Sequence, residues 1–220
     1  MRIRYKPWAR PELEASNFYI DNPEEYKGKW KELFKNKENP IHLELGCGKG
    51  GFISKLASQN QNINYIAIDM VDAMLGLAKR NIEREYNERE IPIENIYITR
   101  FDIERILMML DEADKIARIY INFCNPWPRG KHHKKRLTHI RQLEKYKQFL
   151  KANGEIYFKT DDDNLFNDSL LYFEQAGLKI ENKTYDLAST PSFWNNIETE
   201  HERMFKNEGI KIKAAKVIKI

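Results

Sequence analysis

A glycine-rich turn directly after a short apolar segment is the feature that most constrains the fold of this chain. Residues Ile41 to Leu45 form the apolar segment, and residues 46–51 read Gly-Cys-Gly-Lys-Gly-Gly. A short apolar run predicts a buried strand, and the glycines after it let the backbone turn sharply into a helix. Backbone of this kind can approach a ligand beside the electropositive start of the helix. The segment therefore predicts the first strand, turn and helix of an α/β domain.

The alternation of strands and helices continues toward the C-terminus. Segments rich in β-branched and aromatic residues alternate with segments whose apolar residues recur every three or four positions. This pattern predicts one doubly wound α/β domain over residues 40–220, preceded by an arm with a short helix in residues 1–39. The expected strands are 41–45, 64–68, 96–99, 118–122, 154–159, 179–185 and 211–218, and the expected helices are 24–34, 50–57, 71–86, 103–110, 139–150 and 164–175.

Composition limits the class of protein. A chain of 220 residues can bury one sizeable core. Lys and Arg number 37 against 33 for Asp and Glu, so the net charge of +4 does not by itself indicate nucleic-acid binding. The basic N-terminus lacks an apolar run and no segment is apolar enough to span a bilayer, so we expect a cytoplasmic protein with no membrane partner. Cys47 and Cys124 lie far apart without metal-ligand spacing, which predicts neither a zinc site nor a disulfide.

The glycine spacing fits either a dinucleotide or S-adenosylmethionine, and a carboxylate distinguishes between these two cofactors. Gly46, Gly48 and Gly51 match the dinucleotide fingerprint G-x-G-x-x-G. Asp69 follows at about the 20-residue distance expected for that fingerprint. Glu44, however, precedes the first glycine by two residues. A carboxylate there would repel a pyrophosphate but would suit the ammonium and sulfonium groups of S-adenosylmethionine, which is the cofactor we favour.

Two further carboxylates follow expected strands. Asp69 ends the second strand and can accept hydrogen bonds from both ribose hydroxyls, and Asp102 follows the third strand, where it can lie near the adenine amino group. Acids at such positions also serve as helix N-caps or remain solvated. Their occurrence together with the glycines favours the cofactor interpretation.

A stiff loop and a basic run follow the expected strand at 118–122. Residues 122–128 read Asn-Phe-Cys-Asn-Pro-Trp-Pro, in which the prolines restrict the backbone and the tryptophan offers a flat face. Residues 129–141 then hold six Lys or Arg and three His without an acid. This run predicts contacts to phosphates, and the alternative is a solvated basic loop. The histidines lack a carboxylate or cysteine at ligand spacing, so no metal site is expected.

Four motifs together resemble the bacterial tRNA (guanine-N7)-methyltransferases. The motifs are Glu44 to Gly50, Asn122 to Arg136, Phe158 to Asp161, and Thr199 to Phe205, and the likeness extends from about Pro40 to Ala215. The resemblance implies a Rossmann-like class I methyltransferase fold with a mostly parallel seven-stranded sheet and helices on both faces. It also implies S-adenosylmethionine as cofactor, tRNA as partner, and 7-methylguanosine in the variable loop as product. A monomer and a homodimer are both compatible with it.

The resemblance further implies roles for individual residues. The cofactor-binding residues would be Glu44, Gly46, Gly48, Asp69, Asp102 and Asn125, and the catalytic residues would be Asn125 and Asp161. The substrate-binding residues would be Arg129, Asp161, Thr199, Glu200, His201 and Glu202. The RNA-binding residues would be Lys131, His132, His133, Lys134, Lys135 and Arg136.

The chain departs from the family pattern at two positions. Arg129 stands where the family usually has lysine, which keeps the charge, and Asn125 stands where aspartate is commoner. An amide cannot act as a general base at neutral pH. Guanine N7 has a free lone pair and no proton, so alignment and stabilisation of the developing cation suffice. Asn125 can then hold the base edge, and Asp161 or Glu202 can face the cation, although Asp161 can instead cap the helix expected from Asn164.

Three other functions compete with this interpretation. Asn125-Pro126-Trp127 resembles the Asn-Pro-Pro-aromatic motif of exocyclic-amine methyltransferases, but Trp127 occupies the position of the second proline. A dinucleotide-dependent dehydrogenase is disfavoured by Glu44. An RNA-binding module without activity is disfavoured by the intact glycine turn.

Overall fold

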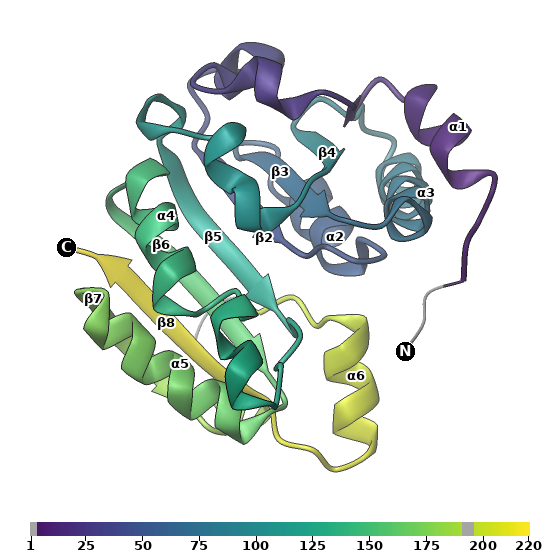
Figure 1. The fold of residues 1–220 in the computed structure, drawn as a ribbon. Coiled ribbons are helices and arrows are strands. Elements are labelled where there is room, and N and C mark those ends of the chain that lie inside the picture. Colours follow the sequence, from purple (N-terminus) through teal and green to yellow (C-terminus); the bar gives the residue numbers. More distant parts are fainter. Residues whose placement is uncertain (1–3, 191–195) are drawn as a thin grey trace. The chain divides into compact units, whose positions relative to one another are not determined.

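The computed structural model describes residues 4–190 and 196–220. Contacts between Cα atoms divide the chain into two compact units, the first ending at Asp114 and the second beginning at Lys115. Each unit contains four strands of the α/β fold (Figure 1).

The four strands of the first unit are all parallel. They are β1 (Tyr19–Ile20), β2 (Ile41–Leu45), β3 (Asn64–Asp69) and β4 (Ile96–Arg100). Their order is β1-β4-β3-β2, with Leu45 opposite Ile68 and Asp69 opposite Arg100. All five residues of β2 are buried, including the polar residues His42 and Glu44. Because parallel strands end at the same edge, β2, β3 and β4 bring their following turns together.

Helices of the first unit connect these strands and cover them. They are α1 (Ala9–Glu14), α2 (Gly51–Gln59) and α3 (Asp72–Glu88), with 3-10 turns η1 (Pro23–Tyr26), η2 (Trp30–Leu33), η3 (Ile103–Met108) and η4 (Glu112–Asp114). The stripe of Leu75, Ala78, Ile82 and Tyr86 on α3 is completely buried. α1 packs along α3 at Gly76, where a Cβ atom would lie 2.8 Å from a ring carbon of Trp8. Helix α1 of the N-terminal arm is therefore packed closely on α3 (Figure 1).

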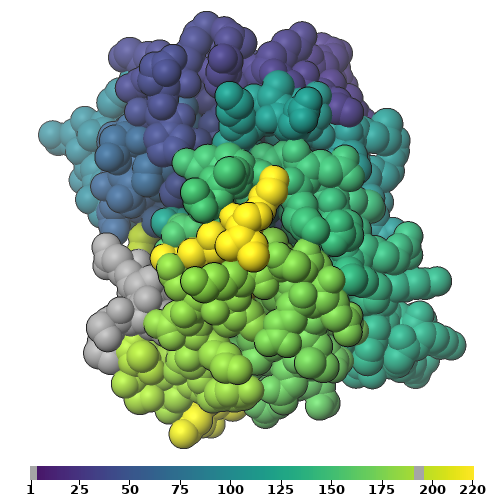
Figure 2. Space-filling model, turned by 90° about the vertical axis from the view of Figure 1, so that its left-hand side faces the viewer, coloured from purple at the N-terminus to yellow at the C-terminus, as the bar shows by residue number. Residues whose placement is uncertain are grey.

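The second unit contains a mixed set of strands. They are β5 (Ile116–Asn122), β6 (Leu150–Thr160), β7 (Leu178–Thr184) and β8 (Lys213–Lys219), in the order β5-β6-β8-β7. β5 and β6 are parallel, whereas β8 is antiparallel to both β6 and β7. The chain ends after β8 at the surface of this unit, where Ile220 is 82% exposed (yellow in Figure 2).

Two helices of the second unit pack on its strands. α4 (Ile140–Phe149) contacts β6, and α5 (Asp163–Gln175) contacts β6, β7 and β8 (Figure 1). Phe166 and Phe173 on α5 lie against Phe158 of β6, each with ring centroids 6.1 Å apart. The remaining elements are α6 (Glu200–Asn207) and the 3-10 turns η5 (Gly130–Lys135) and η6 (Leu187–Ser189).

The expected alternation of strands and helices is confirmed, with several differences. The helix expected over 103–110 forms the 3-10 turn η3, and α1 and α6 lie where the sequence predicts no helix. All seven expected strands are present, and the two-residue strand β1 adds an eighth among the described residues. The single helix expected over 24–34 is wrong, because the segment forms the separate turns η1 and η2. Gly28 lies between them with a φ of 75°, a left-handed conformation that interrupts a helix. Within residues 4–190 and 196–220, no helix combines the length and apolar character needed to cross a membrane.

Candidate functional site

The glycine turn between β2 and α2 leaves room above its backbone. Gly46 and Gly48 have φ values of 79° and 54°, and a Cβ atom at either position would meet no atom within 4 Å. The backbone N–H of Gly46 donates to the carbonyl of Ile68 at 2.9 Å, which holds the turn on β3. Gly50 differs, since a Cβ there would lie 2.7 Å from the Cβ of Ala78 on α3. Two glycines thus expose backbone to open space, while the third permits the two helices to pack.

Carboxylates surround this turn. Glu44 is 2% exposed near the end of β2 and lies opposite Ala67 of β3. Burial raises the pKa of the Cys47 thiol well above its ordinary value, and the nearby charges of Asp69 and Glu44 raise it further. The thiol therefore stays protonated. The two carboxylates bring negative charge to one side of the turn, which suits a cationic ligand.

Asp69 connects the end of β3 to the glycine turn. Its Oδ2 accepts a hydrogen bond from the N–H of Gly48 at 2.9 Å, and its Oδ1 accepts one from the N–H of Val71 at 3.0 Å. Burial raises the pKa of Asp69, whereas these backbone hydrogen bonds oppose that rise. A carboxylate has about four acceptor positions, and Val71, Gly48 and Met70 donate to this one, so Asp69 retains capacity for a ligand hydroxyl.

Asp102 has the helix-cap role considered for it, and its role toward a cofactor stays a prediction. Its Oδ1 accepts a hydrogen bond from the N–H of Glu104 at 2.9 Å, and it is the N-cap of η3. The same residue also lines a surface pocket of about 250 Å³ in the first unit. A helix cap at this position is thus compatible with a ligand contact. The other pocket-lining residues are Asp21, Pro23, Glu24, Met70, Arg100, Phe101 and Arg105.

The loop after β5 has a strained backbone. Phe123 and Trp127 have φ values of 52° and 42°, which non-glycine residues seldom adopt. The Oδ1 of Asn125 accepts a hydrogen bond from the N–H of Trp127 at 3.0 Å, and this contact closes the turn. Asn125 itself is exposed. The loop therefore presents its amide group at the surface in a fixed orientation.

The basic run that follows contains side chains of two kinds. Exposed side chains belong to Arg129, Lys131, Lys134 and Lys135, and His132 and His133 are partly exposed. The ammonium of Lys135 lies 4.9 Å from the ring centroid of Trp127, and the ring of His132 meets that indole edge-on. Arg136, in contrast, is only 1% exposed. Exposure therefore separates Arg136 from the other cations of the run.

Arg136 joins the loop to α5. Its Nε donates to the carbonyl oxygen of Pro126 at 2.7 Å, and one terminal nitrogen forms an ion pair with Asp168. The other terminal nitrogen lies 3.0 Å from Nε2 of His133. A guanidinium has only donors, so Nε2 of His133 is the acceptor in this contact. The buried cation thereby fixes the Pro-Trp-Pro turn and the basic run against one helix.

Asp161 lies at the end of β6 and does not cap the next helix. The N-cap of α5 is Asp162, whose Oδ1 accepts a hydrogen bond from the N–H of Leu165 at 2.6 Å. The main-chain oxygen of Asp161 accepts from Nζ of Lys213 at 2.9 Å. Among the described residues, none forms a hydrogen bond or ion pair with the side chain of Asp161. Its carboxylate is partly exposed.

Thr199 and Glu202 form the first turn of α6. Thr199 Oγ1 accepts from the N–H of Glu202 at 2.9 Å, and the Glu202 carboxylate accepts from the N–H of Thr199 at 3.3 Å, which is a capping box. Glu202 also pairs with Lys159 of β6 at 2.9 Å, and both side chains are buried. His201 stacks on Phe123 with centroids 5.6 Å apart, and Glu200 is exposed. These contacts hold the start of α6 beside the ends of β5 and β6.

The structure divides the predicted site residues between the two units. Glu44, Gly46, Gly48, Asp69 and Asp102 gather at the carboxyl ends of β2, β3 and β4. The other predicted residues lie in the second unit, on the loop after β5, the end of β6 and the start of α6; they are Asn125, residues 129–136, Asp161 and residues 199–202. No cluster of His, Cys, Asp or Glu suited to a metal ion occurs in the part of the chain that the structure describes.

Sequence reasoning missed two supporting residues. Lys159 is a cation within the buried C-terminal half of β6, and that conflict with its buried neighbours was a signal for a buried ion pair. Phe123 carries the stacking contact to α6, but its apolar character alone did not distinguish it from a core residue.

Comparison with known proteins places the chain among methyltransferases. A family described as "Putative methyltransferase" matches residues 38–215. The tRNA (guanine-N(7)-)-methyltransferase of Clostridium botulinum (strain Alaska E43 / Type E3) is 62% identical over 100% of this chain and 99% of its own length. The protein of the same name from Clostridium beijerinckii is 59% identical over 97% of this chain and 96% of its own length.

Solved structures support the same fold. An antibiotic-related methyltransferase matches with a TM-score of 0.58 and 17% identity, covering 100% of this chain and 96% of its own. A mutant 16S rRNA (adenine(1408)-N(1))-methyltransferase from Catenulisporales acidiphilia, determined with its cosubstrate S-adenosylmethionine, also gives a TM-score of 0.58, at 11% identity over 90% of this chain and 91% of its own. The prediction of a Rossmann-like class I methyltransferase fold is confirmed.

The buried Lys159–Glu202 pair yields a prediction about stability. Lys159→Met leaves the charge of Glu202 buried without its cation, so we expect the free energy of unfolding to fall by about 3 kcal/mol. Lys151→Met, on the exposed part of the same strand β6, is the matched control and should change it by less than about 0.5 kcal/mol. Urea unfolding followed by circular dichroism measures both. Equal stability of the Lys159→Met and native proteins would contradict the structural role of the pair.

Proposed function

We infer the reaction from the family: the chain belongs to the tRNA (guanine-N(7)-)-methyltransferases and transfers a methyl group from S-adenosylmethionine to N7 of a guanine in tRNA. The observation that carries this conclusion is 62% identity over the whole chain to a protein of that name. As a finer proposal, the target is the guanosine in the variable loop, giving 7-methylguanosine. We also propose that residues 40–220 form the methyltransferase domain and that the protein acts in the cytoplasm as a monomer or homodimer.

The carboxyl ends of β2, β3 and β4 have the donors and acceptors that S-adenosylmethionine requires. The open space above Gly46 and Gly48 gives room for it against the backbone of the turn. We propose that Glu44 binds its cationic amino-acid end. Asp69 would accept from a ribose hydroxyl, and Asp102 would lie at the adenine. These three acids follow neighbouring strands in the order of the ligand's three parts.

The chemistry of the step requires little proton transfer. S-adenosylmethionine supplies an electrophilic methyl group, and guanine N7 carries a free lone pair. The residues of the chain then need to align the base and stabilise the positive charge that develops on it. We propose that Asn125 orients the base edge. Asp161 is the better candidate to face the cation, because the charge of Glu202 is already compensated by Lys159.

Exposure divides the basic run into two proposed roles. Arg129, Lys131, Lys134 and Lys135 would contact the tRNA backbone or the substrate guanosine, since their charged groups reach solvent. His132 and His133 flank them on η5. We propose that Arg136 acts indirectly, because its guanidinium is occupied by Pro126, Asp168 and His133. The start of α6, residues 199–202, would complete the substrate site through exposed Glu200 and His201.

A single assay tests the proposed reaction. The purified protein is incubated with unmodified tRNA and S-adenosylmethionine labelled in the methyl group, and the digested nucleosides are identified by mass spectrometry. Labelled 7-methylguanosine at the variable loop is expected. An N-methylated adenosine or cytidine would favour an exocyclic-amine methyltransferase instead, and label-free tRNA bound tightly by the protein would favour an RNA-binding module.

The division of the basic run predicts different salt dependences. Lys134→Gln and Lys135→Gln should each reduce the slope of log affinity for tRNA against log salt by about one unit, because each removes a phosphate contact. Arg136→Gln should leave the slope unchanged and lower the unfolding temperature, because Arg136 makes internal contacts. Filter binding at four salt concentrations measures the slopes, with Lys151→Gln as an exposed control. Unchanged slopes in both lysine variants would show that the run is merely solvated.

The turn at Asn125 predicts how its substitutions differ. Asp at this position can accept the same hydrogen bond from the N–H of Trp127, so Asn125→Asp should retain substantial activity. Asn125→Ala loses the contact that closes the turn and should slow the transfer step by about tenfold or more. Single-turnover rates with saturating tRNA and cofactor, measured across neutral pH, isolate this step. A steep rise of the native rate with pH, reporting one deprotonation, would contradict methylation at N7.

A further inference from the structure

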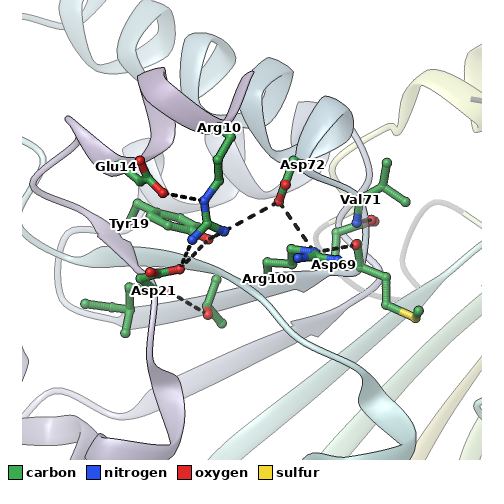
Figure 3. Close-up of polar contacts among 11 residues, drawn as sticks. Arg10, Glu14, Tyr19, Asp21, Asp69, Val71, Asp72 and Arg100 are labelled. Atoms are coloured by element: carbon green, nitrogen blue, oxygen red, sulfur yellow. Dashed lines mark hydrogen bonds and ion pairs between the residues drawn. The ribbon is translucent and has the colours of Figure 1, made fainter. Parts of the chain in front are cut away.

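Arg10 links four acidic or phenolic side chains of the first unit. From α1, its Nε donates to Glu14 at 2.6 Å and its Nη1 donates to the hydroxyl of Tyr19 at 3.0 Å (Figure 3). Its Nη2 forms an ion pair with Asp21, just after β1. Its Nη1 also lies 3.9 Å from the carboxylate of Asp72, the first residue of α3. One guanidinium thus connects residues 10–21 of the N-terminal arm to α3, the helix that follows Asp69.

The contacts continue from Asp72 to the turn that contains Asp69. Asp72 Oδ1 lies 3.5 Å from Nε of Arg100, and the same Nε donates to the carbonyl of Met70 at 3.1 Å. Met70 and Val71 are the residues between Asp69 and α3, and Val71 donates its N–H to Asp69. The polar chain in Figure 3 therefore runs from Arg10 through Asp72 and Arg100 to the carbonyl of Met70, the residue that follows the proposed ribose-binding carboxylate.

The arm also supplies one wall of the pocket at Asp102. Asp21, Pro23 and Glu24 of the arm line this pocket together with Met70 and Asp102. Asp21 is therefore both an ion-pair partner of Arg10 and a pocket-lining residue. Removal of the Arg10 charge would break the ion pair of Asp21 and leave Asp72 paired with Arg100, so the attraction that holds this wall beside α3 would weaken.

Other contacts hold the arm without Arg10. β1 pairs with β4, and Thr99 Oγ1 donates to the carbonyl of Ile20 at 2.7 Å. On the far side of α1, Arg80 of α3 pairs with Glu12, and its guanidinium carbon lies 3.7 Å from the ring centroid of Trp8. Substitution of Arg10 should therefore alter the arm near the pocket while the unit stays folded.

We propose that Arg10 is a positioning residue for the cofactor site, through which the N-terminal arm sets the affinity for S-adenosylmethionine. This inference rests on the proposed location of that site at Asp69 and Asp102. Arg10 acts by fixing Asp21 in the pocket wall and Asp72 behind the Asp69 turn. The arm is accordingly a part of the cofactor site as well as a covering of α3.

The test compares two arginines at the same interface between the arm and α3. Arg10→Gln and the matched control Arg80→Gln lose equal charge, but only Arg10 reaches Asp21 and Asp72. By isothermal calorimetry we expect the Kd for S-adenosylmethionine to rise about fivefold in Arg10→Gln and less than about twofold in Arg80→Gln. The kcat at saturating cofactor and the KM for tRNA should stay near the native values, because the proposed role of Arg10 is confined to the cofactor pocket of the first unit.

A second variant probes the same contact from the other side. Asp21→Asn should raise the Kd by a similar factor, and the double variant Arg10→Gln/Asp21→Asn should bind no more weakly than either single variant. Circular dichroism melts verify that each variant is folded. If Arg10→Gln is unfolded, the Kd values of Asp21→Asn and Arg10→Lys are compared with that of Arg80→Gln instead. Additive effects, or equal Kd values for native protein and Arg10→Gln, would overturn the inference while leaving the proposed reaction intact. Failure of the native protein to bind S-adenosylmethionine would overturn both.

Discussion

The candidate site of the first unit depends on the two hydrogen bonds that the carboxylate of Asp69 accepts from neighbouring turns. Through Oδ2 it holds Gly48 of the turn after β2, and through Oδ1 it holds Val71 before α3. The hydrogen bond from Gly48 is possible because parallel β2 and β3 end at the same edge, with Leu45 opposite Ile68, whereas the one from Val71 is a local contact two residues along the chain. A side chain that joins two consecutive strand-to-helix turns keeps the glycine turn and the start of α3 in one arrangement. The polar chain that leads to Arg10 extends this arrangement to the N-terminal arm.

The sequence predicts the glycine turn and the carboxylates at the strand ends because the signals for both are local. Gly46 and Gly48 mark the turn by their conformational freedom, and Glu44, Asp69 and Asp102 follow from strand ends that apolar patterning locates. Asp102, for which a helix cap was considered beside a ligand contact, caps η3 and also lines a pocket. Local signals of this kind need no knowledge of distant contacts.

The parts that the sequence does not predict depend on residues far apart in the chain. The run 129–136 reads as uniformly basic, yet Arg136 is buried because Asp168, 32 positions later, pairs with it. Lys159 is compensated by Glu202, 43 positions away. Arg10 pairs with Asp72 although three strands, two 3-10 turns and helix α2 lie between them in the chain. Pairing at such separations follows from the packing of elements, so spacing along the chain cannot distinguish a buried ion pair from a solvated charge.

At position 125, the hydrogen bond that closes the turn matters more than whether the side chain is an amide or an acid. The backbone of the loop is held with positive φ at Phe123 and Trp127, conformations that cost about 1–3 kcal/mol each and persist only where neighbouring contacts fix them. The Oδ1 of Asn125 supplies one such contact through the N–H of Trp127, and an aspartate oxygen would supply the same one. Arg136 supplies another through the carbonyl of Pro126. Since a nucleophilic ring nitrogen without a proton requires no base, the two residue types can exchange at this position provided that the turn is kept.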